Sequence, residues 1–323
     1  MRIKTVERMK EAIDVVMLVY NQAETIARAI ESVVKQSVDI PINIIIGDDA
    51  STDDSLQICR KYHAQFPELI QLIRHDKNVG LARNYQICLK QGEGRYIAIL
   101  EGDDFWIRND KLQMQVDVLR ANEQVGLVHT SFFNNISGKW SKYKAPKGIK
   151  LAGNIFEDLY RVNYIGPLTV LFRRDIFESH VDLGEMVRLK SKTIDYLLWL
   201  EFSRHSLVAY LNDSTAVYEK GTISESRPSV LKKQLKFIET TQNILTHINR
   251  KYEIPNDTIV TRQNSLNFQK VIAYYVYGRI QEGNYILTSI KPNVFRHYLV
   301  WIYLRIYILF RIKILRKIVL RVC

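Results

Sequence analysis

The chain has 323 residues, of which 47% are hydrophobic and 25% charged, and it carries a net charge of +12. This length and composition suit one large globular domain with an appendage and exclude a wholly disordered chain. The three cysteines are scattered and odd in number, which excludes a disulfide scaffold and suits a reducing cytosol. Residues 1–16 hold no apolar run of signal-peptide length, so we expect no secretory signal there.

The positive charge is concentrated at the C-terminal end. Residues 294–323 contain no acidic residue and hold seven basic ones: Arg296, Arg305, Arg311, Lys313, Arg316, Lys317 and Arg321. These account for more than half of the net charge of +12, so the rest of the chain is only mildly basic. That distribution argues against a nucleic-acid-binding domain, in which the fold itself would present a basic face.

Short β-branched runs alternate with amphipathic segments through the first 133 residues. This pattern predicts strands at residues 12–20, 42–49, 69–75, 95–100 and 125–133. Helices are predicted between them at residues 24–37, 53–66, 80–94 and 110–122. Asp53 is placed to cap the second helix. Strands and helices that alternate with short links predict an α/β fold with a mainly parallel sheet, covered on both faces.

Polar loops follow four consecutive predicted strands. They read YNQ (20–22), DDASTDD (48–54), HDKNVG (75–80) and EGDDFW (101–106). In open α/β sheets the ligand site lies in the crevice at the carboxyl ends of the strands. Any one of these loops is equally well explained as a turn or a helix cap. All four together predict a binding site at this edge of the sheet.

The fourth loop crowds Glu101, Asp103 and Asp104 onto the end of a buried strand. An uncompensated cluster of this kind raises carboxylate pKa values and destabilises the fold. A hard divalent cation prefers oxygen ligands and would remove the repulsion. Gly102 would allow a ligand to approach the backbone closely. We therefore expect a metal here, with a plain acidic turn as the alternative.

No glycine-rich phosphate cradle is present. The sequence has no GxGxxG after the first strand and no GxxxxGK[ST]. Phosphate would then be held by the metal and by side chains. Asp49 is placed to accept hydrogen bonds from a base or ribose, and Tyr20 offers a ring for stacking or edge contact. Arg83 and Asn84 open the third helix and are within reach of a nucleotide, although a surface salt bridge explains Arg83 equally well.

Three segments together resemble glycosyltransferase family 2. They are VMLVYNQAETIARAIESVVKQS, IIIGDDASTDDS and NVGLARNYQICLKQGEGRYIAILEGDDFW, in the order and spacing of that family. The resemblance covers about the first 130 residues. It implies a GT-A fold, a Rossmann-like domain that binds a nucleotide-sugar donor. It also implies that Asp49 contacts the nucleobase, with the loop around Tyr20 and Asn21 beside it.

By the same resemblance, EGD stands for the family's D-x-D motif. Asp103 would be the principal ligand of a divalent cation, Mg²⁺ or Mn²⁺, with Asp104 beside it. Glu101 would be the acid on the nucleotide side, where Asp is usual. Together with Gly102 and Arg83, these residues complete the expected nucleotide-sugar site.

A catalytic base is expected further along the chain. Residues 190–205, KSKTIDYLLWLEFSRH, form a predicted helix with Asp195 in its first turn. The helix dipole favours a carboxylate at that position, so the alternative is that Asp195 only stabilises the start of the helix. The segment resembles the family's ED-x-x-L-W-L, whose Asp is the base, with Ile194 in place of Glu. The family implies single displacement with inversion. The later segment 216–226 resembles a strand and loop that close over the pyrophosphate, with Glu219 and Lys220 where Arg or His is usual.

The chain changes character after residue 228. We expect a GT-A catalytic domain over 1–228, with the nucleotide-sugar side over about 1–130 and the acceptor side over about 131–228. Residues 229–323 are expected to form a helical C-terminal region, beginning with two amphipathic helices. Its basic, apolar end lacks the ~20 nearly uncharged residues of a spanning helix. It suits a segment lying at a membrane surface, with packing on protein as the alternative.

The sequence thus predicts an inverting, metal-dependent glycosyltransferase acting from a nucleotide sugar, with UDP the first choice, on a hydroxyl acceptor. A saccharide or lipid-linked saccharide would be the acceptor, in cell-surface polysaccharide or lipopolysaccharide synthesis. The protein is expected in the cytoplasm, peripheral to the inner face of the cell membrane, with no nucleic-acid partner. A nucleotidyltransferase would need a glycine-rich, basic first loop, which YNQAET is not. A catalytically inactive nucleotide- or membrane-binding scaffold is the other alternative.

Overall fold

The computed structural model describes residues 9–189, 194–219 and 230–310. These residues divide into two compact units. The first takes in residues up to Phe156 together with 164–190 and 194–222, and the second takes in residues 157–163, 191–193 and everything from Ile223. The second unit thus includes most of the short helix α5 (Phe156–Arg161), which lies in the middle of the chain.

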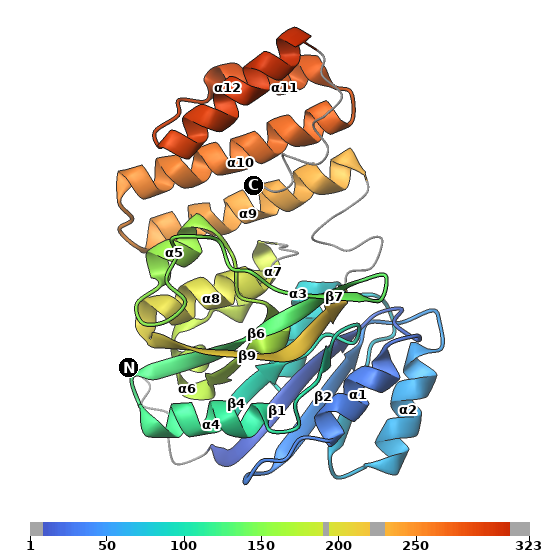
Figure 1. Ribbon diagram of the computed structural model, residues 1–323. Coiled ribbons are helices and arrows are strands. Elements are labelled where there is room, and N and C mark those ends of the chain that lie inside the picture. The colour runs from blue at the N-terminus through green and yellow to red at the C-terminus, as the bar shows by residue number, and fades with distance from the viewer. Residues whose placement is uncertain (1–8, 190–193, 220–229, 311–323) are drawn as a thin grey trace. The chain divides into compact units, whose positions relative to one another are not determined.

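The first unit is built on one sheet of nine strands (Figure 1). The sheet order is β3-β2-β1-β4-β8-β6-β9-β5, with β7 paired to β6. The strands are β1 (Lys10–Val19), β2 (Ile42–Asp48), β3 (Ile70–Arg74), β4 (Gly94–Ile99), β5 (Phe105–Trp106), β6 (Val125–Ile136), β7 (Lys139–Lys142), β8 (Leu171–Arg173) and β9 (Leu207–Glu219). The helices of this part of the chain are α1 (Ile26–Val34), α2 (Ser55–Gln65), α3 (Leu81–Leu89), α4 (Lys111–Ala121), α6 (Arg174–His180), α7 (Leu183–Arg188) and α8 (Ile194–His205).

The prediction of a parallel sheet is confirmed for the first four strands. β2 pairs in parallel with both β1 and β3, and β1 pairs in parallel with β4. Beyond β4 the sheet becomes mixed, because β8 runs antiparallel to both β4 and β6, while β6 and β9 are parallel. The sequence placed β6 as the next strand of the parallel run, but β8, which comes later in the chain, lies between β4 and β6.

The strands are buried on both faces, as their nearly unbroken apolar sequence requires. In β1, Ile13, Val15 and Met17 belong to a core cluster that also contains apolar residues of α1 and α4. Val16 and Leu18, which alternate with them and so point to the other face, are buried as well. α2 begins at Ser55 with Asp54 at its N-cap, so the prediction that Asp53 is the capping residue is wrong. Asp53 Oδ1 accepts from Ser55 N (3.0 Å) in the turn just before the helix.

The second unit is helical. It contains most of α5 (Phe156–Arg161) with α9 (Leu231–Lys251), α10 (Asn256–Val276), α11 (Ile280–Ser289) and α12 (Phe295–Phe310). Tyr160 of α5 donates to Asn249 Oδ1 of α9 at 2.6 Å. A separate core cluster joins α10, α11 and α12 and includes Phe268, Leu287 and Leu304. Among the described residues, no helix combines the length and apolarity needed to cross a membrane.

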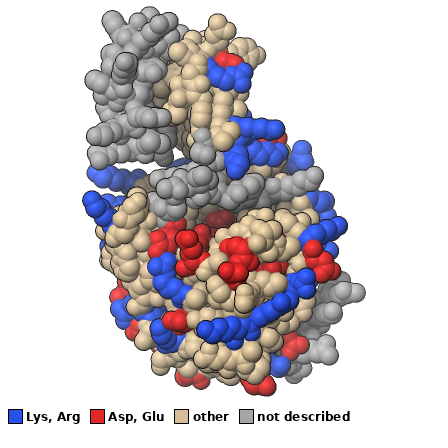
Figure 2. Space-filling model, turned by 90° about the vertical axis from the view of Figure 1, so that its right-hand side faces the viewer, with Lys and Arg blue, Asp and Glu red and all other residues tan. Residues whose placement is uncertain are grey.

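Charges of both signs are mixed on the face shown in Figure 2. Lys and Arg side chains lie among and around Asp and Glu side chains over the coloured part of that face. This agrees with the sequence, in which the cations concentrate near the C-terminal end.

Candidate active site

The four polar loops meet at one edge of the sheet, as the sequence predicts. The register places Val19, the last residue of β1, opposite Asp48, the last residue of β2. Beyond the strands the ladder continues, because Asp49 N donates to Val19 O and Gly102 N donates to Leu18 O. The loops after β1, β2 and β4 are therefore held side by side by backbone hydrogen bonds.

The first two loops are joined by side chains. Asn21 N donates to Ser51 Oγ (3.1 Å), and Thr52 N donates to Asn21 Oδ1 (2.8 Å). Asn21 adopts a left-handed backbone with φ of 53°, which Asn tolerates better than most residues. Tyr20 beside it is exposed and its ring is open to solvent. Asn21 thus shapes the loop that presents Tyr20.

Asp49 is buried and fixes the third loop. Its carboxylate accepts from Val79 N at 2.6 Å and from Gly80 N at 3.0 Å. Its own carbonyl accepts from Asn78 Nδ2 at 3.2 Å. Each carboxylate oxygen has a second lone pair, so these bonds leave acceptor capacity for a base. The contact with a nucleobase stays a prediction.

The two residues expected to open α3 toward a nucleotide differ in position. Arg83 is exposed and donates to Gln86 Oε1. Asn84 is buried, donates to Gly47 O at 2.8 Å and accepts from Cys88 Sγ. The expectation that Asn84 reaches a nucleotide is therefore wrong, because its amide is used to tie α3 to the end of β2.

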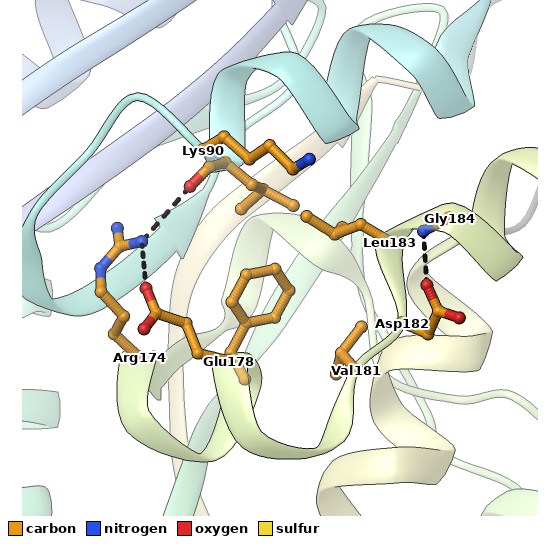
Figure 3. A pocket seen from close by; sticks show the side chains of 9 residues that line it. Lys90, Arg174, Glu178, Val181, Asp182, Leu183 and Gly184 are labelled. Carbon is orange, nitrogen blue, oxygen red and sulfur yellow. Dashed lines mark hydrogen bonds and ion pairs between the residues drawn. The ribbon is translucent and has the colours of Figure 1, made fainter. Parts of the chain in front are cut away.

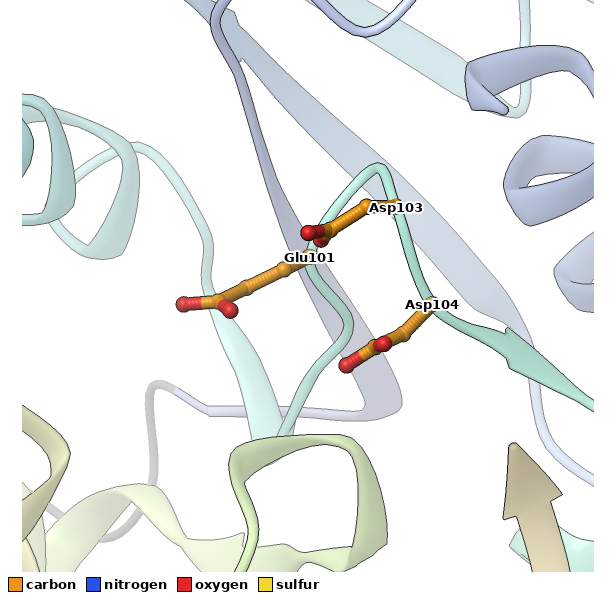
Figure 4. A group of neighbouring side chains, drawn as sticks. All are labelled: Glu101, Asp103 and Asp104. Carbon is orange, nitrogen blue, oxygen red and sulfur yellow. The ribbon is translucent and has the colours of Figure 1, made fainter. Parts of the chain in front are cut away.

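Three carboxylates gather at the end of β4 (Figure 4). Glu101, Asp103 and Asp104 each offer an oxygen within 4.8 Å of the others, and their side chains extend to the same side of the loop. The turn is closed by Asp104 N, which donates to Glu101 O at 3.0 Å. A Cβ on Gly102 would lie 2.5 Å from Gln22 Oε1. The space at this glycine is thus filled by Gln22, and packing alone requires it.

The cluster is electrostatically uncompensated in the protein alone. Burial, with the charges of Asp103 and Asp195, raises the pKa of Glu101 to about 8. Burial raises the pKa of Asp103, and the charge of Glu219 adds to this. Burial also raises the pKa of Asp104 well above its usual range, with Asp103 and Glu101 contributing. Each carboxyl therefore resists ionisation because of burial and of its acidic neighbours.

Asp103 fits the role of a metal ligand. Its Oδ1 is buried and has no hydrogen-bond partner among the described residues. Carboxylate oxygens are the ligands that Mg²⁺ and Mn²⁺ prefer. A cation here would satisfy the buried oxygen and offset the charges of Glu101 and Asp104.

Glu219, at the end of β9, hydrogen-bonds to the acidic loop, the name used here for residues 101–104 at the end of β4. Its backbone N donates to Asp104 Oδ1 at 2.9 Å. Its carboxylate accepts from Arg28 Nη2 (2.8 Å) and from Asn135 Nδ2 (2.9 Å), and the Arg28 guanidinium lies 3.9 Å from the centre of the Phe105 ring. Lys220 and the rest of the loop expected over the pyrophosphate lie outside the described residues.

Asp195 is brought to the acidic loop from α8. Its charge raises the pKa of Glu101 and of the Tyr85 phenol, in both cases in addition to burial. α8 is fixed by its buried apolar side, where Trp199 Nε1 donates to Ile165 O at 3.1 Å. The helix thus brings Asp195 within electrostatic range of Glu101 and Tyr85, which lie far earlier in the sequence.

Two further side chains reach the acidic loop without having been predicted. Tyr85 is buried, and its hydroxyl has no partner among the described residues. Gln22 Oε1 is also buried and unpartnered in the same sense, close to Gly102. The helical pattern of the sequence marks Tyr85 only as a core residue. Gln22 is the third residue of the first polar loop, and this position alone suggests a place in the site.

A hollow of about 410 Å³ lies elsewhere, between α3, α6 and α7 (Figure 3). Its wall contains Arg174, whose guanidinium donates to Asp14 Oδ2 at 2.6 Å in a buried ion pair. Lys90, Phe177 and Leu183 complete much of the lining. Arg174 thus has a structural role as the partner of buried Asp14. None of the predicted site residues lines the hollow.

Known proteins resemble both the sequence and the fold. The family model described as glycosyl transferase family 2 matches residues 14–181, just over half of the chain. The uncharacterized protein Rv1520 of Mycobacterium tuberculosis is 30% identical over 207 residues, covering 64% of this chain. That match spans 58% of the length of Rv1520.

A second relative matches along nearly its whole length. The UDP-Glc:alpha-D-GlcNAc-diphosphoundecaprenol beta-1,3-glucosyltransferase WfgD of Escherichia coli is 26% identical over 283 residues, covering 88% of this chain and 95% of WfgD. Among solved structures, the mannosyltransferase PcManGT from Pyrobaculum calidifontis, in complex with GDP-Man and Mn²⁺, superimposes with a TM-score of 0.59 at 15% identity. The superposition covers 92% of this chain and 80% of that structure, which establishes a GT-A fold.

Proposed function

The chain belongs to glycosyltransferase family 2 and is a glycosyltransferase, and we propose that it moves a sugar from a nucleotide-sugar donor to a hydroxyl acceptor with inversion. The observation that carries the proposal is the convergence of Asp103, Asp104, Glu101 and Asp195 at the carboxyl ends of the strands. UDP-sugars are the first donors to test, because the printed name of WfgD specifies UDP-Glc.

We propose that the loops after β1 and β2 bind the nucleoside and that the loop after β4 binds the cation. Tyr20, Asn21 and Asp49 lie together at the ends of β1 and β2 and would bind the nucleoside, with Arg83 on the neighbouring helix. Asp103 would hold a divalent cation, with Asp104 and Glu101 beside it. Such a cation would stabilise the departing nucleoside diphosphate as a Lewis acid. PcManGT, which has the same fold, is described with Mn²⁺ and GDP-Man.

Asp195 would act as the general base. Its carboxylate would accept the proton of the acceptor hydroxyl while the acceptor oxygen bonds to the anomeric carbon and the bond to diphosphate breaks. Attack opposite the leaving group inverts that carbon in a single displacement. The placement of Asp195 beside Glu101 supports this role, because the base must lie close to the groups that hold the donor.

The acceptor is proposed to be a saccharide carried on a lipid diphosphate. The printed name of WfgD describes such an acceptor, and its match covers 88% of this chain. The same name supports a role in cell-surface polysaccharide or lipopolysaccharide synthesis, which we propose takes place at the inner face of the cell membrane. The proposal agrees with the apolar, basic character of the C-terminal sequence.

The test compares donor binding and turnover in matched variants. Wild type, Asp103→Asn and Asp195→Asn would be titrated with UDP-, GDP- and dTDP-sugars in Mn²⁺, in Mg²⁺ and in EDTA. Asp213→Asn, an exposed carboxylate paired with Arg108, serves as the control. We expect metal-dependent binding of one donor that Asp103→Asn abolishes. Asp195→Asn should bind the donor normally but lower turnover by about 10²- to 10⁴-fold.

Two outcomes would overturn the proposal. The first is that wild type binds none of the nucleotide sugars in any metal. The second is that binding survives both EDTA and Asp103→Asn. Either would remove the metal-assisted donor site and favour a scaffold that lacks glycosyl transfer through these acids.

A further inference from the structure

α12 has apolar side chains on both of its sides. His297, Val300, Trp301 and Leu304 follow helical spacing on the inner side, where Val300, Trp301 and Leu304 join the cluster made with α10 and α11. On the outer side, Tyr298, Leu299 and Ile302 are exposed. Only one side of this helix is therefore accounted for by packing within its own unit, and a helix that is apolar all round normally has its other side covered.

The exposed apolar residues concentrate in this part of the chain. Thirteen large hydrophobic residues are exposed among the described residues. Eight of these lie between positions 276 and 302: Val276, Tyr277, Ile280, Tyr285, Val294, Tyr298, Leu299 and Ile302. In the upper part of Figure 2, where α10–α12 lie, the coloured surface is largely uncharged. Exposed apolar residues that gather in one part of a protein mark an interaction site more often than scattered ones do.

The charges that follow Glu282 in the sequence have one sign. After Glu282 the sequence contains no Asp or Glu, and its basic residues are Lys291, Arg296, Arg305, Arg311, Lys313, Arg316, Lys317 and Arg321. Long basic side chains lay their apolar stems on hydrophobic surface and extend their charges toward a polar boundary. An exposed apolar helix side in a segment whose sequence carries only basic charge complements a partner that is apolar inside and anionic at its surface.

We propose that the outer side of α12, formed by Tyr298, Leu299 and Ile302, docks on the surface of an anionic lipid bilayer. Leu299 and Ile302 would enter the boundary between headgroups and acyl chains, and Tyr298 would lie at the headgroup level. The basic sequence after Glu282 would be attracted to anionic headgroups. A second copy of the chain fits less well, because a symmetric contact would set this basic surface against itself. The inference deepens the proposed membrane setting and does not depend on the donor.

Two matched double variants of the full chain test the proposal. Leu299→Gln with Ile302→Gln removes two aliphatic side chains that are 51% and 47% exposed. Ile136→Gln with Val230→Gln removes two that are 49% and 51% exposed but lie outside this surface. Glutamine keeps good helix propensity, so α12 should persist. Binding is measured by sedimentation with vesicles of phosphatidylcholine alone and of phosphatidylcholine mixed with phosphatidylglycerol.

We expect wild type to bind the anionic vesicles more tightly than the neutral ones, and less tightly as salt is raised. The α12 double variant should lose about tenfold or more of this affinity, while the control variant should change by less than about twofold. Equal losses in both variants, or wild-type binding indifferent to anionic lipid, would overturn the proposal. So would a dimer in sedimentation velocity that only the α12 variant dissociates, because the surface would then join two copies.

Donor binding measured on the same samples separates the two proposals. A chain that binds vesicles but no nucleotide sugar contradicts the proposed function and leaves the membrane surface standing. A chain that binds a nucleotide sugar but no anionic vesicle contradicts the membrane surface alone.

Discussion

Asp103→Asn should reverse its effect on stability when a divalent cation is added. In the metal-free protein, burial and the charge of Glu219 raise the pKa of Asp103, so the folded state disfavours the ionised carboxylate. A neutral amide of the same size removes that penalty at neutral pH. With the cation present, the same substitution removes the oxygen that we expect to bind it.

The stability that the substitution gains without the metal and the stability that it loses with the metal are of similar size. Each unit by which burial raises a carboxyl pKa corresponds to about 1.4 kcal/mol against the ionised form, a penalty that the neutral amide of Asn does not carry. Asp103→Asn should therefore raise the free energy of unfolding by about 1–2 kcal/mol in EDTA. A cation at a hundred times its Kd stabilises the wild type by about 2.7 kcal/mol and the variant by much less. The variant should thus be the more stable protein in EDTA and the less stable one in Mn²⁺.

Thermal unfolding in EDTA and in graded Mn²⁺ checks this order. About 1 kcal/mol corresponds to roughly 2–4 °C in Tm for a unit of this size, which is readily measured. Asp213→Asn, at an exposed ion pair with Arg108, is the control and should follow wild type in both conditions. The reasoning is refuted if Asp103→Asn lowers Tm in EDTA, or if Mn²⁺ raises the Tm of wild type and variant equally.

Three further changes test the site and its support. Burial and neighbouring carboxylates raise the pKa of Glu101 to about 8. In EDTA, between about pH 5 and pH 8, the folded protein therefore still holds a proton that the unfolded chain has already lost. Stability should fall across that range, and Glu101→Gln should flatten the slope in thermal unfolding. Gly47→Ala places a Cβ 2.4 Å from Asn84 Oδ1 and should cost about 1–3 kcal/mol in urea unfolding. Arg174→Met leaves Asp14 buried without its cation and should cost about 3–5 kcal/mol, whereas a loss under about 1 kcal/mol would contradict that pairing.

The half of the fold that binds the nucleotide could be predicted because its signals are local. Each strand from β1 to β4 is a short apolar run, and each is followed by a polar loop and a helix. The position of β8 between β4 and β6 could not be predicted, because three residues, Leu171–Arg173, carry almost no periodicity. Their place is decided by pairing with strands more than 40 residues earlier in the chain.

The site divides in the same way. The sequence brought the acidic loop and the loops after β1 and β2 together, because parallel strands end at one edge. Asn84 was misplaced, since the sequence does not reveal that Gly47 leaves room for its amide to bond to the end of β2. Tyr85 was missed because a buried aromatic residue on a helix is indistinguishable from core until its hydroxyl is located.

The hydrogen bonds around the acidic loop favour Asp103 as the principal ligand of the metal that we propose there. Glu219 is matched with Arg28 and Asn135, and it donates its backbone N–H to Asp104. Asp103 Oδ1 is left buried without a partner among the described residues. The fold uses nearby donors on Glu219 and Asp104, which leaves Asp103 Oδ1 as a buried acceptor that a bound cation would satisfy. The D-x-D resemblance and the pattern of satisfied oxygens thus arrive independently at the same residue.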